Sequence, residues 1–121
     1  LVFGAWRGPR LVGAVGVRQS DHPKTRHKAN LWGVYVRASE RGQGVCRALM
    51  GEALAYTASH ARMVQLGVMA ENTAAIALYQ SLGFKVWGRE PEGFCTNGRY
   101  YDELYMYLPL KTPVSPAPDG I

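Results

Sequence analysis

Short apolar runs, separated by polar segments that contain glycine or proline, set the pattern along the chain. The runs 1–8 and 10–17 lie on either side of Gly8-Pro9, a pair typical of turns, and so predict a β-hairpin. Four further runs predict strands, and they cover residues 31–36, 63–70, 84–89 and 99–108. The basic segment 18–30 and the segment 90–98, with its two glycines and a proline, predict loops.

Two segments show the three- and four-residue spacing of apolar positions that is typical of helices. In segment 45–60 the recurring positions are Cys46, Leu49, Met50, Ala53 and Thr57. Segment 73–82 follows Asn72, a good N-cap, and precedes Gly83, a good residue just beyond a helix. The predicted order is β-β-β-α-β-α-β-β. Because a strand–helix–strand crossover joins parallel strands and hairpins are antiparallel, we predict an α/β fold of the α+β type with a mixed central sheet.

The length and composition are those of one globular domain. The chain has 121 residues, of which 47% are hydrophobic and 19% charged. We expect a single domain over residues 1–110 and a disordered, proline-rich tail over 111–121. No apolar run approaches the ~18 residues of a membrane span, and no signal peptide is recognisable. A cytoplasmic protein without a membrane partner is therefore expected.

Charge and cysteine content narrow the partners further. The net charge of +5 favours anionic partners, such as nucleic acid or a phosphorylated nucleotide cofactor. The aromatic residues are not interleaved with a basic stripe, so nucleic acid ranks last and is not expected as a partner. Cys46 and Cys95 lack the spacing of a metal motif, so we expect no metal and two reduced thiols.

The segment RGQGVCR, residues 41–47, follows a predicted strand and leads into a predicted helix. Gly42 and Gly44 can adopt backbone angles that other residues avoid, and the N–H groups at the helix start can then converge on one anion. A pyrophosphate fits such a turn, although a lone G-x-G is also typical of a plain connector. A dinucleotide fingerprint is a weak match because Arg47 stands where its third glycine would be, and a P-loop is excluded.

Four other positions carry weaker signals. Asn72 and Tyr79 lie two helical turns apart on the same side of the predicted helix; alone, they are a cap and a packed aromatic residue. Gly33 and Gly67 interrupt predicted strands, where glycine often marks a bulge or a close backbone approach.

Together, the two motifs resemble the GCN5-related N-acetyltransferase (GNAT) family. The pattern R-G-x-G-x before a helix, then N-x-x-A-x-x-x-Y-x-x-x-G-F after the next strand, carries the resemblance, which is close over residues 31–84. Cys46 departs from the Gly or Ala usual in the family, and Gly67 stands where many members that acetylate peptide amines have a general-base Glu. The family's usual first strand and two helices are also absent, so the resemblance implies a GNAT-like acyl-CoA N-acyltransferase fold that is N-terminally truncated.

The resemblance also implies a site for acetyl-CoA as the acetyl donor. Strands 31–36 and 63–70 would splay and hold the pantetheine arm, which would face backbone groups of Val34, Tyr35 and Val36. Arg41 and the loop N–H groups would hold the pyrophosphate; the loop residues are Gly42, Gln43, Gly44, Val45, Cys46 and Arg47. Asn72 would bond to the pantetheine region, and Tyr79 would reach the CoA sulfur as the catalytic proton donor.

The implied function is an acetyl-CoA-dependent N-acetyltransferase that acts on a primary amine of a small molecule or peptide by direct attack on the thioester. A non-catalytic acyl-CoA-binding module is the alternative. The general base stays open among Glu40, Glu71 and a water chain. The amine acceptor cannot be read from the sequence, although loop 90–98 is expected to help form its pocket, and a homodimer is left open.

Overall fold

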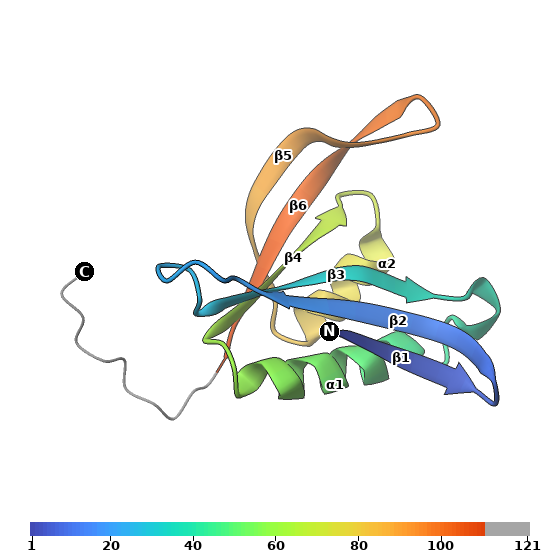
Figure 1. The fold of residues 1–121 in the computed structure, drawn as a ribbon. Coiled ribbons are helices and arrows are strands. Elements are labelled where there is room, and N and C mark those ends of the chain that lie inside the picture. The colour runs from blue at the N-terminus through green and yellow to red at the C-terminus, as the bar shows by residue number, and fades with distance from the viewer. Residues whose placement is uncertain (111–121) are drawn as a thin grey trace.

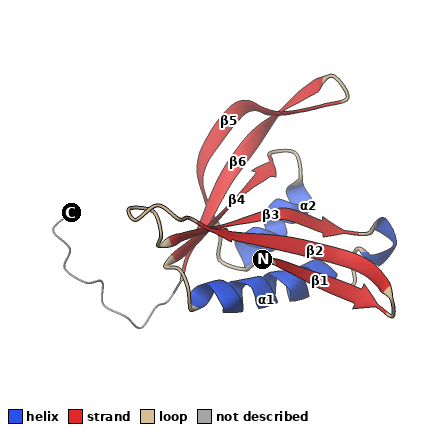
Figure 2. Cartoon of the chain, in the orientation of Figure 1, coloured by secondary structure: helices blue, strands red, loops and turns tan. Residues whose placement is uncertain are grey.

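A computed structural model gives the structure of residues 1–110. It contains a six-stranded sheet in the order β1-β2-β3-β4-β6-β5 and two α-helices, which confirms the predicted mixed sheet and element order (Figure 1). The strands are β1 (Val2–Arg7), β2 (Arg10–Gln19), β3 (Lys28–Val36), β4 (Met63–Met69), β5 (Lys85–Thr96) and β6 (Arg99–Pro109). The helices are the 3-10 helix η1 (Ala38–Glu40), α1 (Val45–Ala58) and α2 (Thr73–Ser81), which Figure 2 shows in blue. No helix within these residues is long and apolar enough to cross a membrane.

Both α-helices pack against one face of the sheet. Alternate residues of a strand point to the same face, and Val64, Leu66 and Val68 on β4 enter the same core as Met106 on β6. Apolar side chains of α1 and α2 complete that core, which includes Leu49, Met50, Ala53 and Tyr79. The opposite face of β4 and β6 therefore carries the intervening residues, which include Gly67, Met69, Glu103 and Tyr105.

The neighbouring parallel strands β3 and β4 pair over a short stretch and then separate. The register pairs Lys28 with Met63 and ends with Asn30 opposite Gln65. Beyond these residues the two strands diverge (Figure 1), which leaves an open edge on each. The splay implied by the family resemblance is therefore present.

The two strand glycines mark different features. Gly33 has a φ of +60° and lies where the β2–β3 register shifts, so it forms the expected bulge. Gly67 instead leaves room for a side chain, because a Cβ at this position would overlap the Oε2 atom of Glu103. The close approach predicted at residue 67 is thus made by a side chain rather than by backbone.

The helix boundaries follow the predicted ones closely. Helix α1 ends at Ala58, two residues before the predicted end at His60. Asn72 caps α2 through its Oδ1, which accepts a hydrogen bond from the N–H of Ala75 at 3.2 Å, and Gly83 beyond the helix has a φ of +102°.

The predicted loop over 90–98 is wrong. Strand β5 continues to Thr96, and Asn97-Gly98, with φ values of 52° and 73°, forms the turn of a long β5–β6 hairpin. Pro91 and Gly93 fall in a bulge, where the register shifts between Glu90 and Phe94. Loop 18–30 is also shorter than predicted because β2 ends at Gln19 and β3 begins at Lys28. The tail predicted over 111–121 lies outside the described residues.

Candidate acyl-CoA site

The loop between β3 and α1 turns sharply because of two glycines. Gly42 has a φ of +77° and Gly44 a φ of +81°, the left-handed region that side chains with a Cβ rarely adopt. A Cβ at either position would meet no atom within 4 Å, so backbone conformation rather than space requires glycine here. Gly44 is the N-cap of α1, and no side chain occupies the cap position as an acceptor.

The start of α1 consequently presents free donors. The first backbone bond into the helix runs from the N–H of Ala48 to the carbonyl of Gly44 at 3.0 Å. Within residues 1–110 the N–H groups of Val45, Cys46 and Arg47 have no acceptor, and the positive end of the helix dipole lies at the same place. This arrangement favours an anion.

A pocket of about 300 Å³ lies directly over this loop. Its lining brings together seven of the residues predicted from the sequence, namely Val36, Arg41, Gly42, Gly44, Val45, Cys46 and Arg47, together with Glu40 and Leu78. Val34, Tyr35, Gln43, Asn72 and Tyr79 do not line it. The predicted loop site is therefore assembled by the fold, whereas the residues predicted along the pantetheine arm lie elsewhere along the β3–β4 opening and on α2.

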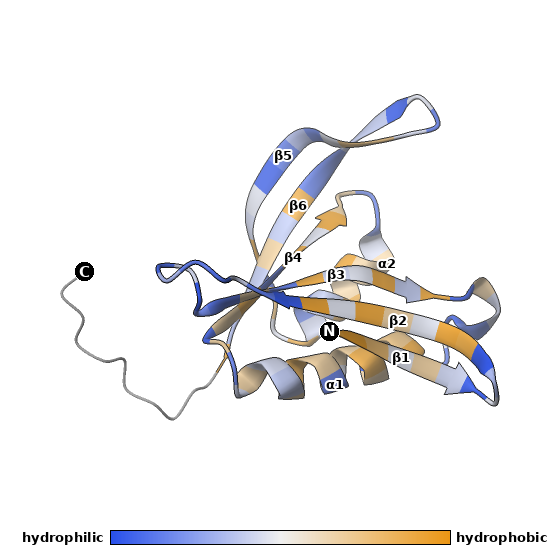
Figure 3. Ribbon diagram, viewed as in Figure 1, coloured by the Kyte–Doolittle hydropathy of each residue, from blue (hydrophilic) through white to orange (hydrophobic). Residues whose placement is uncertain are grey.

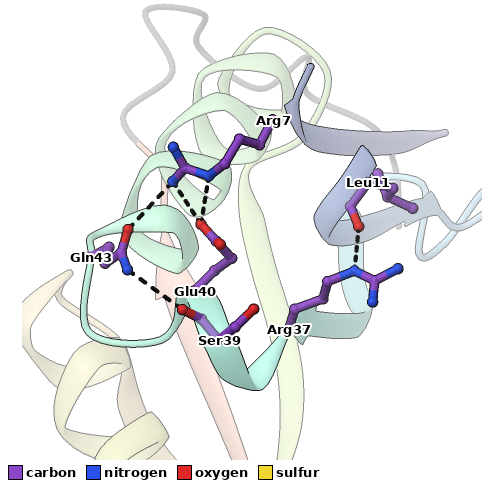
Figure 4. A network of polar contacts seen from close by, with 6 residues as sticks. All are labelled: Arg7, Leu11, Arg37, Ser39, Glu40 and Gln43. Atoms are coloured by element: carbon purple, nitrogen blue, oxygen red, sulfur yellow. Dashed lines mark hydrogen bonds and ion pairs between the residues drawn. The ribbon is translucent and has the colours of Figure 1, made fainter. Parts of the chain in front are cut away.

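A polar network attaches this loop to the β1–β2 hairpin (Figure 4). Arg7 donates to Glu40 Oε1 from both Nε and Nη2, at 2.9 and 2.6 Å, and from Nη2 to the side-chain oxygen of Gln43 at 3.3 Å. Gln43 in turn donates to the carbonyl of Ser39 at 3.5 Å. The side chain of Gln43 thus supports the loop from outside the pocket, and Glu40 is already paired with a guanidinium. No pattern in the sequence points to Arg7, which lies 33 residues before Glu40 in the chain.

Two arginines give the pocket its charge. Arg41 Nε donates to the carbonyl of Val36 at 3.3 Å, which holds the side chain across the loop. Arg47 Nη2 donates to Ser81 Oγ at 2.9 Å and so links the start of α1 to the end of α2. Each guanidinium keeps further N–H groups for an anion.

Backbone N–H groups near the end of β3 point toward the gap between β3 and β4. The N–H of Arg37 donates to the carbonyl of Val12 on β2 at 2.8 Å. Successive N–H groups of an extended chain point to opposite edges, so those of Val36 and Val34 face away from β2, toward the open edge.

Tyr79 lies in the core with its hydroxyl at the edge. Its side chain is 5% exposed and packs against Phe84 with ring centroids 6.0 Å apart. Burial, and secondarily the nearby Cys46, raises the pKa of Tyr79 to about 12. Within residues 1–110 the hydroxyl of Tyr79 forms no hydrogen bond. Every fully buried polar side-chain atom in this region has a hydrogen-bond partner, so the Tyr79 hydroxyl is not fully buried and reaches the surface.

Cys46 and Asn72 complete the predicted set. Burial raises the pKa of the Cys46 thiol, so this group is a neutral, half-buried wall of the pocket. Asn72 is exposed, and its Oδ1 serves the helix cap while its amide NH₂ remains a donor. Within residues 1–110 no group of three or more His, Cys, Asp or Glu side chains is placed to hold a metal ion.

Sequence comparison places these features among known proteins. A sequence model of the acetyltransferase (GNAT) family matches residues 1–84. Spermidine N(1)-acetyltransferase of Vibrio cholerae is 33% identical over 68% of this chain and 49% of its own length. L-amino acid N-acetyltransferase AaaT of Escherichia coli is 30% identical over 79% of this chain and 60% of its own length. The chain thus spans about half the length of such curated relatives.

Solved structures share the fold. Ribosomal-protein-alanine N-acetyltransferase from Brucella melitensis has a TM-score of 0.82 and 31% identity, over 90% of this chain and 68% of that one. The yncA protein of Salmonella typhimurium, solved with acetyl-CoA as its cofactor, has a TM-score of 0.85 and 23% identity, over 98% and 69% of the two chains. By its matching sequence and its fold, this chain belongs to the acetyltransferase (GNAT) family.

Proposed function

We propose that this chain binds acetyl-CoA and transfers the acetyl group to a primary amine of a small molecule or peptide by direct attack on the thioester. The observation that carries the proposal is one continuous feature, in which the β3–β4 opening leads to the unpaired N–H groups at the start of α1. Acetyl-CoA has a matching layout, with an extended arm that ends in a doubly charged pyrophosphate.

The charged end of the ligand is assigned to the loop. The N–H groups from Gly42 to Arg47 hold the pyrophosphate, and the guanidinium groups of Arg41 and Arg47 balance its charge. The pantetheine arm lies in the β3–β4 opening and pairs with the free edge of Val34, Tyr35 and Val36, as an added strand would. The side-chain amide of Asn72 contacts the arm from the other side.

The chemistry has three requirements. The amine must be deprotonated to attack, the developing oxyanion needs a donor, and the thiolate needs a donor as it leaves. The N–H of Val36 supplies the second requirement. The hydroxyl of Tyr79 supplies the third as a hydrogen bond to the thiolate. A pKa of about 12 makes complete proton transfer to a thiolate cost more than the ~2 kcal/mol expected at ordinary pKa values.

A non-catalytic acyl-CoA-binding module is the alternative. It is favoured by Gly67, which offers no carboxylate where many relatives have a Glu, and it needs the same loop. The two functions differ only in turnover, so binding data alone do not separate them.

The separating experiment measures CoA release with a panel of amines for the wild type and for Tyr79→Phe. We expect kcat to fall by about 10²-fold in the variant, since general-acid contributions are typically ~10² to 10⁴. The affinity for acetyl-CoA should stay within a few-fold because the lost bond is made mainly in the transition state. Equal turnover in both proteins would remove Tyr79 from the mechanism, and binding without any turnover would favour the module.

A further inference from the structure

The side chain of Glu103 lies in a slot formed by glycines of the two strands beside it. On β4, a Cβ at Gly67 would overlap Glu103 Oε2 and come within 3.0 Å of its Cδ. On β5, a Cβ at Gly93 would lie 2.8 Å from the Cβ and 3.2 Å from the Oε1 of Glu103. Any other residue at 67 or 93 would displace this carboxylate. The missing side chain of Gly67 is thus replaced in space by a carboxylate from β6.

The bulge in β5 positions one wall of this slot. The register slips between Glu90 and Phe94, and Glu92 in the bulge has a φ of 53°. Asp102 holds the bulge by accepting from the N–H of Glu92 at 3.0 Å and from Arg89 Nε at 2.7 Å. Glu103 therefore packs against the backbone of the β5 bulge, which is held in place by the side chain of Asp102, the preceding residue.

One wall of the slot, Gly67, borders the gap between β3 and β4. The last β3–β4 pair is Asn30 with Gln65, so Gly67 lies two residues beyond the end of this pairing, on the part of β4 that borders the gap. Gly67 and Glu103 lie on the face of the sheet opposite the helices. The β5–β6 hairpin that carries Glu103 has hydrophilic stretches along both strands, with apolar residues between them (Figure 3).

The surroundings of Glu103 are negative. Glu90 on β5 is paired with Glu103 on β6 in the antiparallel register. Tyr105, two residues after Glu103 on β6, donates a hydrogen bond from its hydroxyl to Glu90. These carboxylates hold the pKa of Tyr105 above its ordinary value, so its hydroxyl stays a donor. Within residues 1–110 neither Glu90 nor Glu103 forms an ion pair with a basic side chain. From β4, the facing residues Gly67 and Met69 carry no charge.

We propose, on the basis of the acetyl transfer proposed above, that Glu103 binds the acceptor amine and is the general base for its attack on the thioester. The neutral amine attacks the carbonyl carbon, the N–C bond forms and the C–S bond breaks. The nitrogen becomes more acidic as that bond forms, so its proton passes to the Glu103 carboxylate, while the CoA thiolate leaves and accepts a hydrogen bond or proton. Water then takes the proton from Glu103.

The same carboxylates set the charge of the acceptor. A cationic amine is attracted to Glu90 and Glu103, whereas a carboxylate next to the amine is repelled. The acceptor class is therefore an amine without an adjacent negative charge. An amino-acid amide should have a higher kcat/KM than the corresponding free amino acid.

The test compares Glu103→Gln with the wild type and with Glu52→Gln, an exposed control on α1. We expect Glu103→Gln to lower kcat/KM for the amine by about 10²-fold near neutral pH. This deficit should narrow at high pH, because hydroxide can then accept the proton from the attacking nitrogen in place of the carboxylate. Stabilisation by acetyl-CoA should be unchanged in all three proteins, and Glu52→Gln should turn over like the wild type.

A relocation variant tests position rather than stability. Glu103→Ala removes the carboxylate, and adding Gly67→Glu supplies one from β4, so the double variant should recover about tenfold or more of the lost rate. Wild-type rates in Glu103→Gln across the pH range would overturn the role of Glu103 and leave the proposed function intact. Failure of acetyl-CoA to stabilise the wild type would overturn the proposed function itself. Binding without turnover of any amine would overturn the base together with the transfer reaction.

Discussion

Arg7 and Glu40 join the β1–β2 hairpin to the loop that precedes α1. Both Nε and Nη2 of Arg7 donate to the Oε1 atom of Glu40, at 2.9 and 2.6 Å, although the two residues lie 33 positions apart in the chain. The Glu40 side chain is 12% exposed and that of Arg7 is 64% exposed. The pair therefore fixes the loop from its solvent side and leaves the donors at the start of α1 free for a ligand.

Replacement of Arg7 by Ala should loosen the loop more than it destabilises the fold. An exposed ion pair typically contributes ~0 to 1 kcal/mol, so the change in the free energy of unfolding should fall in that range. Affinity for acetyl-CoA should fall several-fold because the loop must then be ordered on binding. Arg10→Ala, on the same hairpin and without an ion pair in the described region, is the matched control. Equal affinities in both variants, measured by titration calorimetry, would argue against a role for the pair in the site.

Replacement of Gly44 by Ala should damage both stability and binding. The φ of +81° would force a Cβ into the left-handed region, at a cost of about 1–2 kcal/mol, or would turn the N–H groups away from the pocket. Gly51→Ala is the control, because Gly51 lies inside α1 with no atom within 4 Å of an added Cβ. That change should stabilise the chain by about 0.5–1 kcal/mol. Urea unfolding and acetyl-CoA titration of both variants measure the contrast, and similar behaviour of the two would contradict it.

Cys46 should prove to be a wall of the pocket and not a nucleophile. Burial raises the pKa of its thiol, so little thiolate is present at neutral pH, although the group lies at a helix N-terminus. Cys46→Ala should therefore keep acetyl-CoA affinity and turnover within a few-fold of the wild type. Alkylation by iodoacetamide should be slow at neutral pH and accelerate as the pH rises. Loss of turnover with intact binding would assign the thiol a chemical role.

Tyr79 should make the fold sensitive to high pH. Its pKa is about 12 in the folded chain and near 10 in the unfolded chain, so the folded state holds this proton more tightly. Stability from this source is fully present below pH ~10 and is lost as the pH rises toward ~12. Tyr79→Phe should flatten that decline in an alkaline unfolding series followed by circular dichroism. An identical decline in the variant would place the titrating group elsewhere.

Local sequence signals predicted most of the fold. Asn72 and Gly83 delimit α2, and the glycines at 42 and 44 mark the turn before α1, because capping and left-handed conformations depend on single residues. Segment 90–98 is predicted as a loop because Pro91 and Gly93 interrupt the strand pattern, whereas β5 continues to Thr96. Contacts of Asp102, on the neighbouring strand, hold this bulge within β5, and short-range patterns do not record such contacts.

The sequence predicted the loop residues of the site but not the residues that support it. Arg7 reaches Glu40, and Glu103 reaches the space over Gly67, only through the pairing of distant strands. Their partners lie dozens of residues away, and neither residue belongs to a motif. Because sequence patterns do not record such distant contacts, they point to Glu40 and Glu71 as candidate bases and not to Glu103. In the structure Glu40 is instead paired with Arg7.

Ligand-dependent stabilisation shows whether the β3–β4 opening and the loop before α1 form an acyl-CoA site. Thermal unfolding is followed with acetyl-CoA, NADH or ATP at equal concentrations. A ligand that binds only the folded state stabilises it by ~2.7 kcal/mol at a concentration of 100 times its Kd. We expect a clear rise in Tm with acetyl-CoA, little change with NADH or ATP, and loss of the acetyl-CoA effect in Gly44→Ala. No shift with saturating acetyl-CoA, or an equal shift with NADH, would contradict it.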